Sequence, residues 1–171
     1  MRTPTLFVLF ACTVALPACH AAPCGGCAEY ETCERVTGQC ALNDGTRFDL
    51  EAVDGDVPGD SWDPFFGPPD PYICVSTATM SEQCTSPDSD THSPSWNTVL
   101  LSDLDGAQLL ATPLQMRYVD SDVDSDDPIC SGPVTLQEAL IHAGGFRYNC
   151  SNGASAHFTL HNTVRGTPPV L

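Results

Sequence analysis

The residues best suited to chemistry in this chain are aspartates that gather in two groups. The sequence has 22 acidic residues, most of them Asp, against six basic residues, all of them Arg. Aspartate is a short, hard oxygen donor that suits turns, so such groups can present carboxylates to a calcium ion. The groups are Asp54, Asp56, Asp60, Asp63 and Asp70, and Asp120, Asp122, Asp124, Asp126 and Asp127.

The second group puts five carboxylates into residues 120–127, and their repulsion must be offset by a divalent cation or by solvent. A solvated acidic loop is the simplest interpretation of such a run. An EF-hand loop beginning at Asp120 is rejected, because its sixth position is Ser125 instead of Gly and its twelfth is Ser131 instead of Glu. The residues before Asp120 also alternate in polarity as a strand does, whereas an EF-hand needs a helix there.

The cysteines indicate an oxidising compartment, because ten in 171 residues is a high content and disulfides persist there. Zinc or redox chemistry at the CxxC of residues 24–27 fits poorly, since no βαβ pattern surrounds it and the next pair is spaced C-x6-C. We expect disulfides from Cys24, Cys27, Cys33, Cys40, Cys74, Cys84, Cys130 and Cys150. Cys74 and Cys84 flank an expected hairpin and would pair, leaving Cys130 for Cys150, although four cysteines allow three connectivities. A free catalytic thiol is the minor alternative.

The N-terminus is expected to be a targeting segment. Arg2 precedes an apolar run over residues 5–16 that is too short to span a bilayer. The following Leu-Pro-Ala-Cys resembles a bacterial lipobox, which implies a signal peptide over residues 1–19 and a lipid on Cys19. Ordinary cleavage near Ala21 or Ala22, giving a secreted protein, is the alternative.

Two units are expected in the mature chain. Residues 20–45 have too few aliphatic side chains for a core, so disulfides must hold them together. This unit resembles the small EGF-like modules that follow the lipid anchor of bacterial surface lipoproteins, and a spacer or partner-binding role is expected. Residues 46–171 contain short apolar or alternating runs between Gly, Pro, Asp and Ser clusters, which predicts an all-β sandwich. The runs cover residues 47–53, 72–76, 96–101, 114–118, 146–150 and 156–160, and the first places Phe48, Leu50 and Ala52 on one face. Within it, a capping box at Thr135 and Glu138 predicts one short helix that ends at Gly144.

Three segments of the second unit resemble the C2 domain family. They are the DPY triplet at residues 70–72, the THSPSWN segment at residues 91–97, and the DSD of residues 120–122 followed by DDPI. The resemblance covers residues 46–165 and implies an eight-stranded antiparallel β-sandwich. Ser93 and Cys130 depart from the Asn and Gly that the family usually has at these positions.

The resemblance also implies a calcium site built by loops at one end of the sandwich. Carried over residue by residue, the ligands would be Asp63, Asp70, Asp120, Asp122 and Asp127, with Asp60, Asp124 and Asp126 as reserves. Phe65 and Phe66, at the tip of the first loop, would either contact a membrane or partner or pack into the core. Sites of this kind in extracellular modules bind calcium at roughly 10⁻⁴ to 10⁻³ M.

These features predict a non-catalytic, calcium-binding surface protein that binds a membrane or a protein. No HExxH, GxSxG or phosphate-binding glycine loop occurs, and a net charge of -16 disfavours nucleic acid as a partner. The expected location is the cell envelope, outer membrane or cell surface, and otherwise the secreted fraction. The alternative is a structural or adhesion lipoprotein whose acidic loops are only rigidified by calcium or bind no metal.

Overall fold

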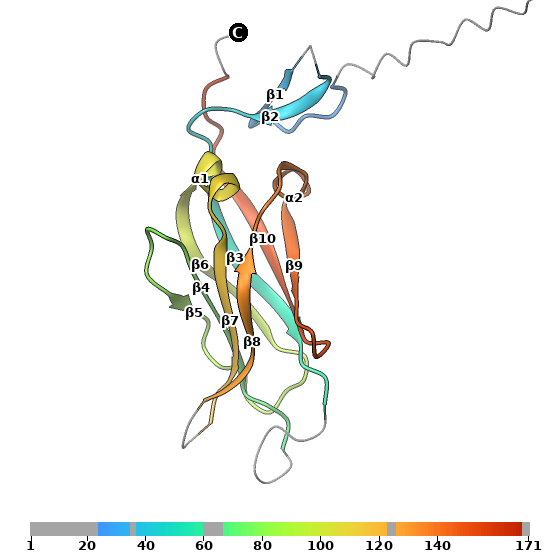
Figure 1. Cartoon of the computed structure of the whole chain (residues 1–171), viewed down its shortest axis with the longest axis vertical. Helices are drawn as coiled ribbons and strands as arrows, with labels where there is room; N and C mark the ends of the chain where they lie inside the picture. Colours follow the sequence, from blue (N-terminus) through green and yellow to red (C-terminus); the bar gives the residue numbers. More distant parts are fainter. Residues whose placement is uncertain (1–23, 35–36, 60–66, 123–125, 169–171) are drawn as a thin grey trace, which may run out of the picture.

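A computed structural model describes residues 24–34, 37–59, 67–122 and 126–168 of the chain (Figure 1). The first described part is a small hairpin of β1 (Glu31–Glu34) and β2 (Gln39–Leu42). Disulfides join Cys24 to Cys33 and Cys27 to Cys40. We refer to residues 24–42 as the cysteine module, because these two crosslinks hold it together.

The rest of the chain forms two facing four-stranded antiparallel sheets, in the orders β6-β3-β10-β9 and β5-β4-β7-β8. The expected eight-stranded sandwich is therefore confirmed. Its strands are β3 (Arg47–Asp56), β4 (Pro71–Ser76), β5 (Gln83–Cys84), β6 (Ser95–Asp105), β7 (Leu114–Asp120), β8 (Asp127–Val134), β9 (Gly145–Asn149) and β10 (Ser155–Val164).

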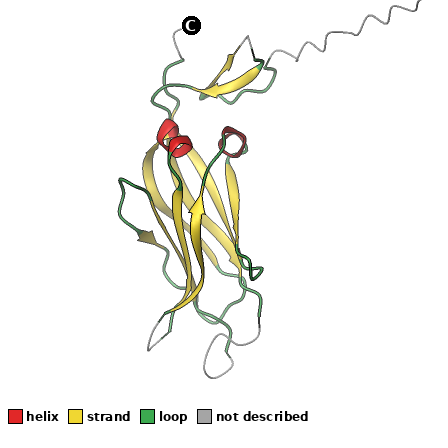
Figure 2. Cartoon of the chain, in the orientation of Figure 1, coloured by secondary structure: helices red, strands yellow, loops and turns green. Residues whose placement is uncertain are grey.

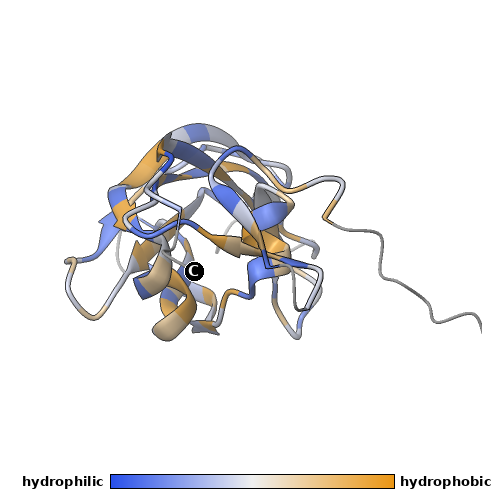
Figure 3. Cartoon of the chain, turned by 90° about the horizontal axis from the view of Figure 1, so that it is seen from above, coloured by the Kyte–Doolittle hydropathy of each residue, from blue (hydrophilic) through white to orange (hydrophobic). Residues whose placement is uncertain are grey.

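The core lies between the two sheets and follows from the period-two pattern of the strands. In β3, Phe48, Leu50 and Ala52 are fully buried, as their alternation predicts, because successive side chains of a strand point to opposite faces. Hydrophobic and hydrophilic positions alternate along the ribbons when the molecule is seen along its long axis (Figure 3). Strand β4 differs, since Tyr72 and Cys74, which face away from the core, are buried as well.

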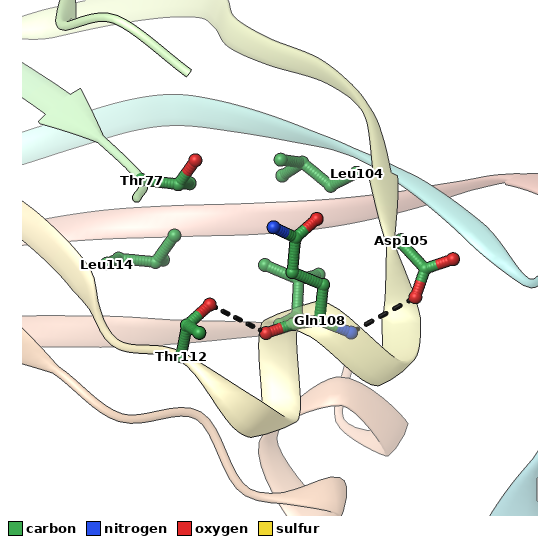
Figure 4. Close-up of a pocket in the computed structure, with 7 residues that line it drawn as sticks. Thr77, Leu104, Asp105, Gln108, Thr112 and Leu114 are labelled. Carbon is green, nitrogen blue, oxygen red and sulfur yellow. Dashed lines mark hydrogen bonds between the residues drawn. The ribbon is translucent and has the colours of Figure 1, made fainter. Parts of the chain in front are cut away.

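Two short helices lie at the same end of the sandwich (Figure 2). Helix α1 (Gly106–Ala111) was not predicted. The Asp105 side chain caps it by accepting a 3.0 Å hydrogen bond from the backbone N–H of Gln108, and the Thr112 hydroxyl donates to the backbone carbonyl of Gln108 (Figure 4). The hollow beside α1 has a volume of about 10 Å³, room for about one water.

The second helix, α2 (Glu138–His142), begins later than predicted. Its N-cap is Gln137, which makes no side-chain capping bond, so the expected capping box at Thr135 is wrong. Gly144 does follow the helix with a φ of 74°, in the left-handed conformation that suits glycine at a helix end. A helix of five residues is so short that a capping pattern in the sequence does not determine its first residue.

The two disulfides of the sandwich have the expected pairing. Cys74 joins Cys84 across the β4–β5 hairpin, and Cys130 of β8 joins Cys150 after β9. Because β8 and β9 are edge strands of different sheets, the second crosslink ties the two sheets together. The spacing of the four cysteines along the chain favoured this pairing, and the tertiary structure shows which of the three possible connectivities is present.

The cysteine module packs against one end of the sandwich. The Tyr30 ring meets Phe48 edge to face at 5.3 Å, and its hydroxyl donates to the Ile141 carbonyl at 3.2 Å. Glu31, whose side chain is only 2% exposed, accepts a 2.8 Å hydrogen bond from Nδ1 of His142. The Arg165 guanidinium pairs with Glu29. These contacts define the module end of the sandwich, and they cross the predicted boundary at residue 46.

The ends of the described chain share that location. A short bridge pairs Asp44 with Thr167, so the last described residues run beside the link between module and sandwich. Figure 1 shows the red end of the described chain at the same end of the molecule as β1 and β2. Of the described residues, none belongs to a helix of the length and apolarity that a membrane span requires.

Candidate metal centre

The described aspartates of both groups meet at the end of the sandwich opposite the module. Strand pairing fixes this placement, because Asp54 lies opposite Ser95, and Asp120 lies opposite both Pro71 and Asp127. We use the name aspartate tip for these residues and the loop residues beside them. The aspartate tip comprises Asp54, Asp56, Asp70, Asp88, Asp90, Asp120, Asp122, Asp126 and Asp127.

A direct contact joins the two predicted ligand loops. The backbone N–H of Asp70 donates a 2.6 Å hydrogen bond to Oδ1 of Asp120, although 50 residues separate them. The Ser121 N–H returns a 3.0 Å bond to the Asp70 carbonyl. Asp120 is fully buried, which a carboxylate tolerates only when it is well bonded. The structure therefore brings Asp70 and Asp120 together, and Asp122 lies two residues beyond Asp120.

Asp127 shares a face with Asp120. The two residues lie directly opposite each other on β8 and β7, and side chains of directly paired residues project to the same side of a sheet. Asp126, one residue earlier, is bonded elsewhere: its Oδ2 accepts a 2.6 Å hydrogen bond from the Tyr72 hydroxyl. This geometry favours Asp127 over Asp126 as the acidic residue that ends the loop, as the family resemblance implies.

Two aspartates of the tip were missed by the sequence analysis. The Asp90 N–H donates to Oδ1 of Asp70 at 2.6 Å, and Oδ2 of Asp88 accepts from the Ser95 N–H at 2.8 Å. Both lie in the loop before β6, directly ahead of the THSPSWN segment. Their position just before this segment could have identified them, because residues next to a segment at one end of a sandwich lie at the same end.

Several predicted positions lie outside the described residues. They are Cys19, Asp60, Asp63, Phe65, Phe66 and Asp124. The described part of the predicted ligand set is thus Asp70, Asp120, Asp122 and Asp127.

The tip concentrates negative charge, and the arginine ion pairs of the described chain lie elsewhere. Arg117 pairs with Glu82 at 2.8 Å, and Arg47 lies 3.7 Å from Asp105 at the module end. Burial raises the pKa of Tyr118 far above its ordinary value, and the nearby charges of Asp56 and Asp54 raise this pKa further. A cation at the tip would offset this repulsion, and carboxylate oxygens are the donors that calcium prefers.

Two other clusters of possible ligands among the described residues have no thiolate to offer a metal. One groups Cys27 and Cys40 with Glu31, and the other groups Cys74 and Cys84 with Glu82. In both, the sulfur atoms are already joined as disulfides, which leaves no thiolate for a metal.

No family model and no curated protein sequence matches this chain. Solved structures do. A structure described as that of a C2 domain superposes with a TM-score of 0.51 at 15% identity, over 70% of this chain and 99% of the other. The sandwich has a C2-like fold.

Two further matches belong to larger chains. A calcium-bound structure of the paired C2 domains of Extended-Synaptotagmin 2 matches with a TM-score of 0.51 and 17% identity, over 70% of this chain and 46% of the other. Human GIVD cytosolic phospholipase A2 matches with a TM-score of 0.53 and 18% identity, over 71% of this chain and 18% of its own. This chain thus spans less than half of either protein, and the likeness concerns the fold.

Proposed function

We propose that this protein is a non-catalytic, C2-like module that binds calcium at the aspartate tip and, through it, a phospholipid membrane. The observation that carries the proposal is the contact between Asp70 and Asp120, which places two carboxylate-rich loops against each other at one end of the sandwich. Calcium takes six to eight oxygen ligands, and loops distant in sequence can supply them when the fold brings them together.

The residues that would hold the ion are Asp70, Asp120, Asp122 and Asp127. Bound calcium would add positive charge at the tip, so that anionic lipid phosphates are attracted instead of repelled. Asp120 would be the fixed ligand, because it is buried and bonded to the Asp70 amide. The calcium-bound Extended-Synaptotagmin 2 structure supports the choice of ion through the shared fold.

The cellular setting is part of the proposal. A signal peptide cleaved before Cys19, a lipid on that residue and a cell-surface location agree with the four disulfides of the described chain, since disulfides persist in oxidising compartments. Metabolic labelling with a radioactive fatty acid tests the lipid. Label should enter the wild-type chain and be lost from Cys19→Ser.

Calcium binding is tested by thermal unfolding with calcium and with chelator. A ligand that binds only the folded state at tenfold its Kd stabilises by about 1.4 kcal/mol. For a chain of this size, that stabilisation raises Tm by about 3–6 °C. The variant Asp122→Asn/Asp127→Asn should lose this rise. Its two positions are less buried than Asp120, so folding should survive.

A matched control is Asp103→Asn, which removes a carboxylate at the module end, 78% exposed, where no calcium site is proposed. It should keep the full calcium response. An unchanged wild-type Tm at millimolar calcium would refute the calcium site. It would favour the second candidate, a structural envelope protein held by disulfides with a solvated acidic rim. Calcium-dependent sedimentation with phosphatidylserine vesicles then separates membrane binding from calcium binding alone.

A further inference from the structure

The described chain both begins and ends at the module end of the molecule, far from the aspartate tip. The described chain enters through the cysteine module, at Cys24, and leaves beside it, where Thr167 pairs with Asp44. The aspartate tip lies at the far ends of the same strands. Figure 1 shows both sequence ends of the described chain on the module side. Any attachment before Cys24 or after Pro168 therefore joins the molecule at the end opposite the tip.

The cysteine module cannot swing freely to bring this attachment toward the tip. The Tyr30 hydroxyl is bonded to α2 and its ring packs edge to face against Phe48 of β3, and the buried Asn43 donates its backbone N–H to the Tyr30 carbonyl. The hydroxyl of the buried Thr46 donates to the Asn43 carbonyl at 2.6 Å. These bonds fix the polypeptide where it passes from module to sandwich, so the module keeps its orientation.

The dimensions separate the attachment from the tip. Strand β3 has ten residues, which span about 33 Å at a rise of about 3.3 Å per residue. Five peptide units lie between Cys19 and Cys24, with a reach of at most about 17 Å when fully extended. A membrane that holds Cys19 can therefore meet the tip only if the sandwich lies flat on it.

Lying flat on an anionic membrane is unfavourable for this chain. The net charge of the whole chain is -16, so an anionic surface repels the body of the molecule as well as the tip. Anionic surfaces repel such a body over about one Debye length, near 8 Å at physiological ionic strength. The upright orientation, with the tip far from the attachment, is the favoured one.

We infer that the aspartate tip binds in trans: its partner is a phosphate-bearing lipid surface other than the membrane that carries the N-terminus. This inference rests on the proposed calcium-dependent membrane binding, and it adds the side on which that binding occurs. The protein then acts as a calcium-dependent link between two lipid surfaces.

The test uses residues 20–171, with an N-terminal biotin in place of the lipidated Cys19, held on neutral phosphatidylcholine vesicles through streptavidin. Acceptor vesicles contain phosphatidylserine. We expect calcium to cluster the two populations, seen as energy transfer between their lipid dyes, and chelator to disperse them. A C-terminal biotin should cluster them equally, because both sequence ends lie on the module side.

Two further arms make the outcome decisive. Ser93→Cys, tethered through a maleimide lipid, attaches the protein by its tip and should lose clustering while keeping its fold. In the last arm the tethering vesicle also contains phosphatidylserine, and clustering should persist. If the free protein binds phosphatidylserine vesicles in calcium but the N-terminally tethered protein clusters them from neither kind of tethering vesicle, the tip does not reach a second surface and the inference is overturned. Clustering that is lost only when the tethering vesicle contains phosphatidylserine would show that the tip binds in cis, and this also overturns the inference. If the free protein does not bind at all, the proposed function fails with it.

Discussion

The Tyr72 hydroxyl donates a 2.6 Å hydrogen bond to Oδ2 of Asp126, which ties the start of β4 to the end of the loop that follows β7. Arg117 lies over the Tyr72 ring, with its guanidinium carbon 5.9 Å from the ring centre. Burial raises the pKa of Tyr72, as does the Asp126 hydrogen bond, so the phenol stays protonated and remains a donor. One tyrosine thus anchors the residue next to the proposed ligand Asp127.

Replacing this tyrosine should weaken calcium binding. Tyr72→Phe removes only the hydroxyl, so we expect about 1 kcal/mol less stability and a lower calcium affinity, because Asp127 loses its anchored neighbour. Titration calorimetry and urea unfolding measure the two effects. Asp126→Asn keeps an amide oxygen that accepts the same bond and should retain most of the affinity. Equal affinity in Tyr72→Phe and wild type would show that the bond does not position the loop.

Gly55 leaves room for the buried Tyr118 ring. A Cβ on this glycine would lie 2.6 Å from the Tyr118 hydroxyl and 3.0 Å from the Ser155 carbonyl oxygen. Gly55→Ala should therefore destabilise the sandwich by about 1–3 kcal/mol in denaturant unfolding.

The same hydroxyl gives a matched rescue experiment. In the described part of the chain it is a buried donor with no hydrogen-bond partner, so Tyr118→Phe should be neutral or slightly stabilising. Combined with Gly55→Ala, it should recover part of the lost stability, since the two groups touch. Strict additivity of the two changes would mean that the Ser155 carbonyl, and not the hydroxyl, limits the space.

The Arg117–Glu82 pair should add stability that depends on pH. Its bidentate hydrogen bonds, at 2.8 and 3.1 Å, lower the pKa of Glu82 from its ordinary 4.5. A lowered folded-state pKa means that the contribution is present above the unfolded value and is lost as pH falls through the folded one. Both side chains are over 40% exposed, so about 0.2–1 kcal/mol is expected.

Chemical denaturation between pH 7 and pH 3 measures this effect. Glu82→Gln should lose the acid-dependent part and show a smaller drop in stability over that range. Glu138→Gln, which neutralises an exposed carboxylate on α2, is the control and should follow wild type. A Glu82→Gln profile parallel to wild type would show that the pair contributes nothing measurable.

Tyr30 should hold the cysteine module to the sandwich. Tyr30→Ala removes the ring contact with Phe48 as well as the hydrogen bond to Ile141. We expect the free energy of unfolding to fall by about 2–4 kcal/mol and the amide hydrogens of β1 and β2 to exchange faster. Tyr30→Phe keeps the ring contact and should lose only about 1 kcal/mol. Unchanged exchange in Tyr30→Ala would mean that the other contacts suffice to keep the module in place.

Local sequence signals predicted most strands of the sandwich, because alternation at period two is a property of neighbouring residues. Phe48, Leu50 and Ala52 illustrate this, since one face of a strand must be apolar wherever a core covers it. Strand β8 was not predicted as a strand, and its two prolines, Pro128 and Pro133, explain why: they interrupt the pattern and are tolerated at a sheet edge.

Both helices are too short to be predicted reliably from the local sequence pattern. Helix α1 has six residues and α2 has five, so neither completes the periodic pattern that identifies a helix. Thr135 has the right spacing for a capping box with Glu138, but the chain stays extended through Gln137 before the helix begins.

The sequence by itself determined the fold class and the acidic character of the loops, and it predicted a ligand set of which four aspartates lie among the described residues. Family motifs and residue chemistry suffice for these, since they depend on residue type and order. Only the tertiary structure decided that the Asp70 amide meets Asp120, that Asp126 is bound by Tyr72, and that the module sits opposite the tip. Those facts depend on strand register and on contacts between residues tens of positions apart, which no local pattern encodes.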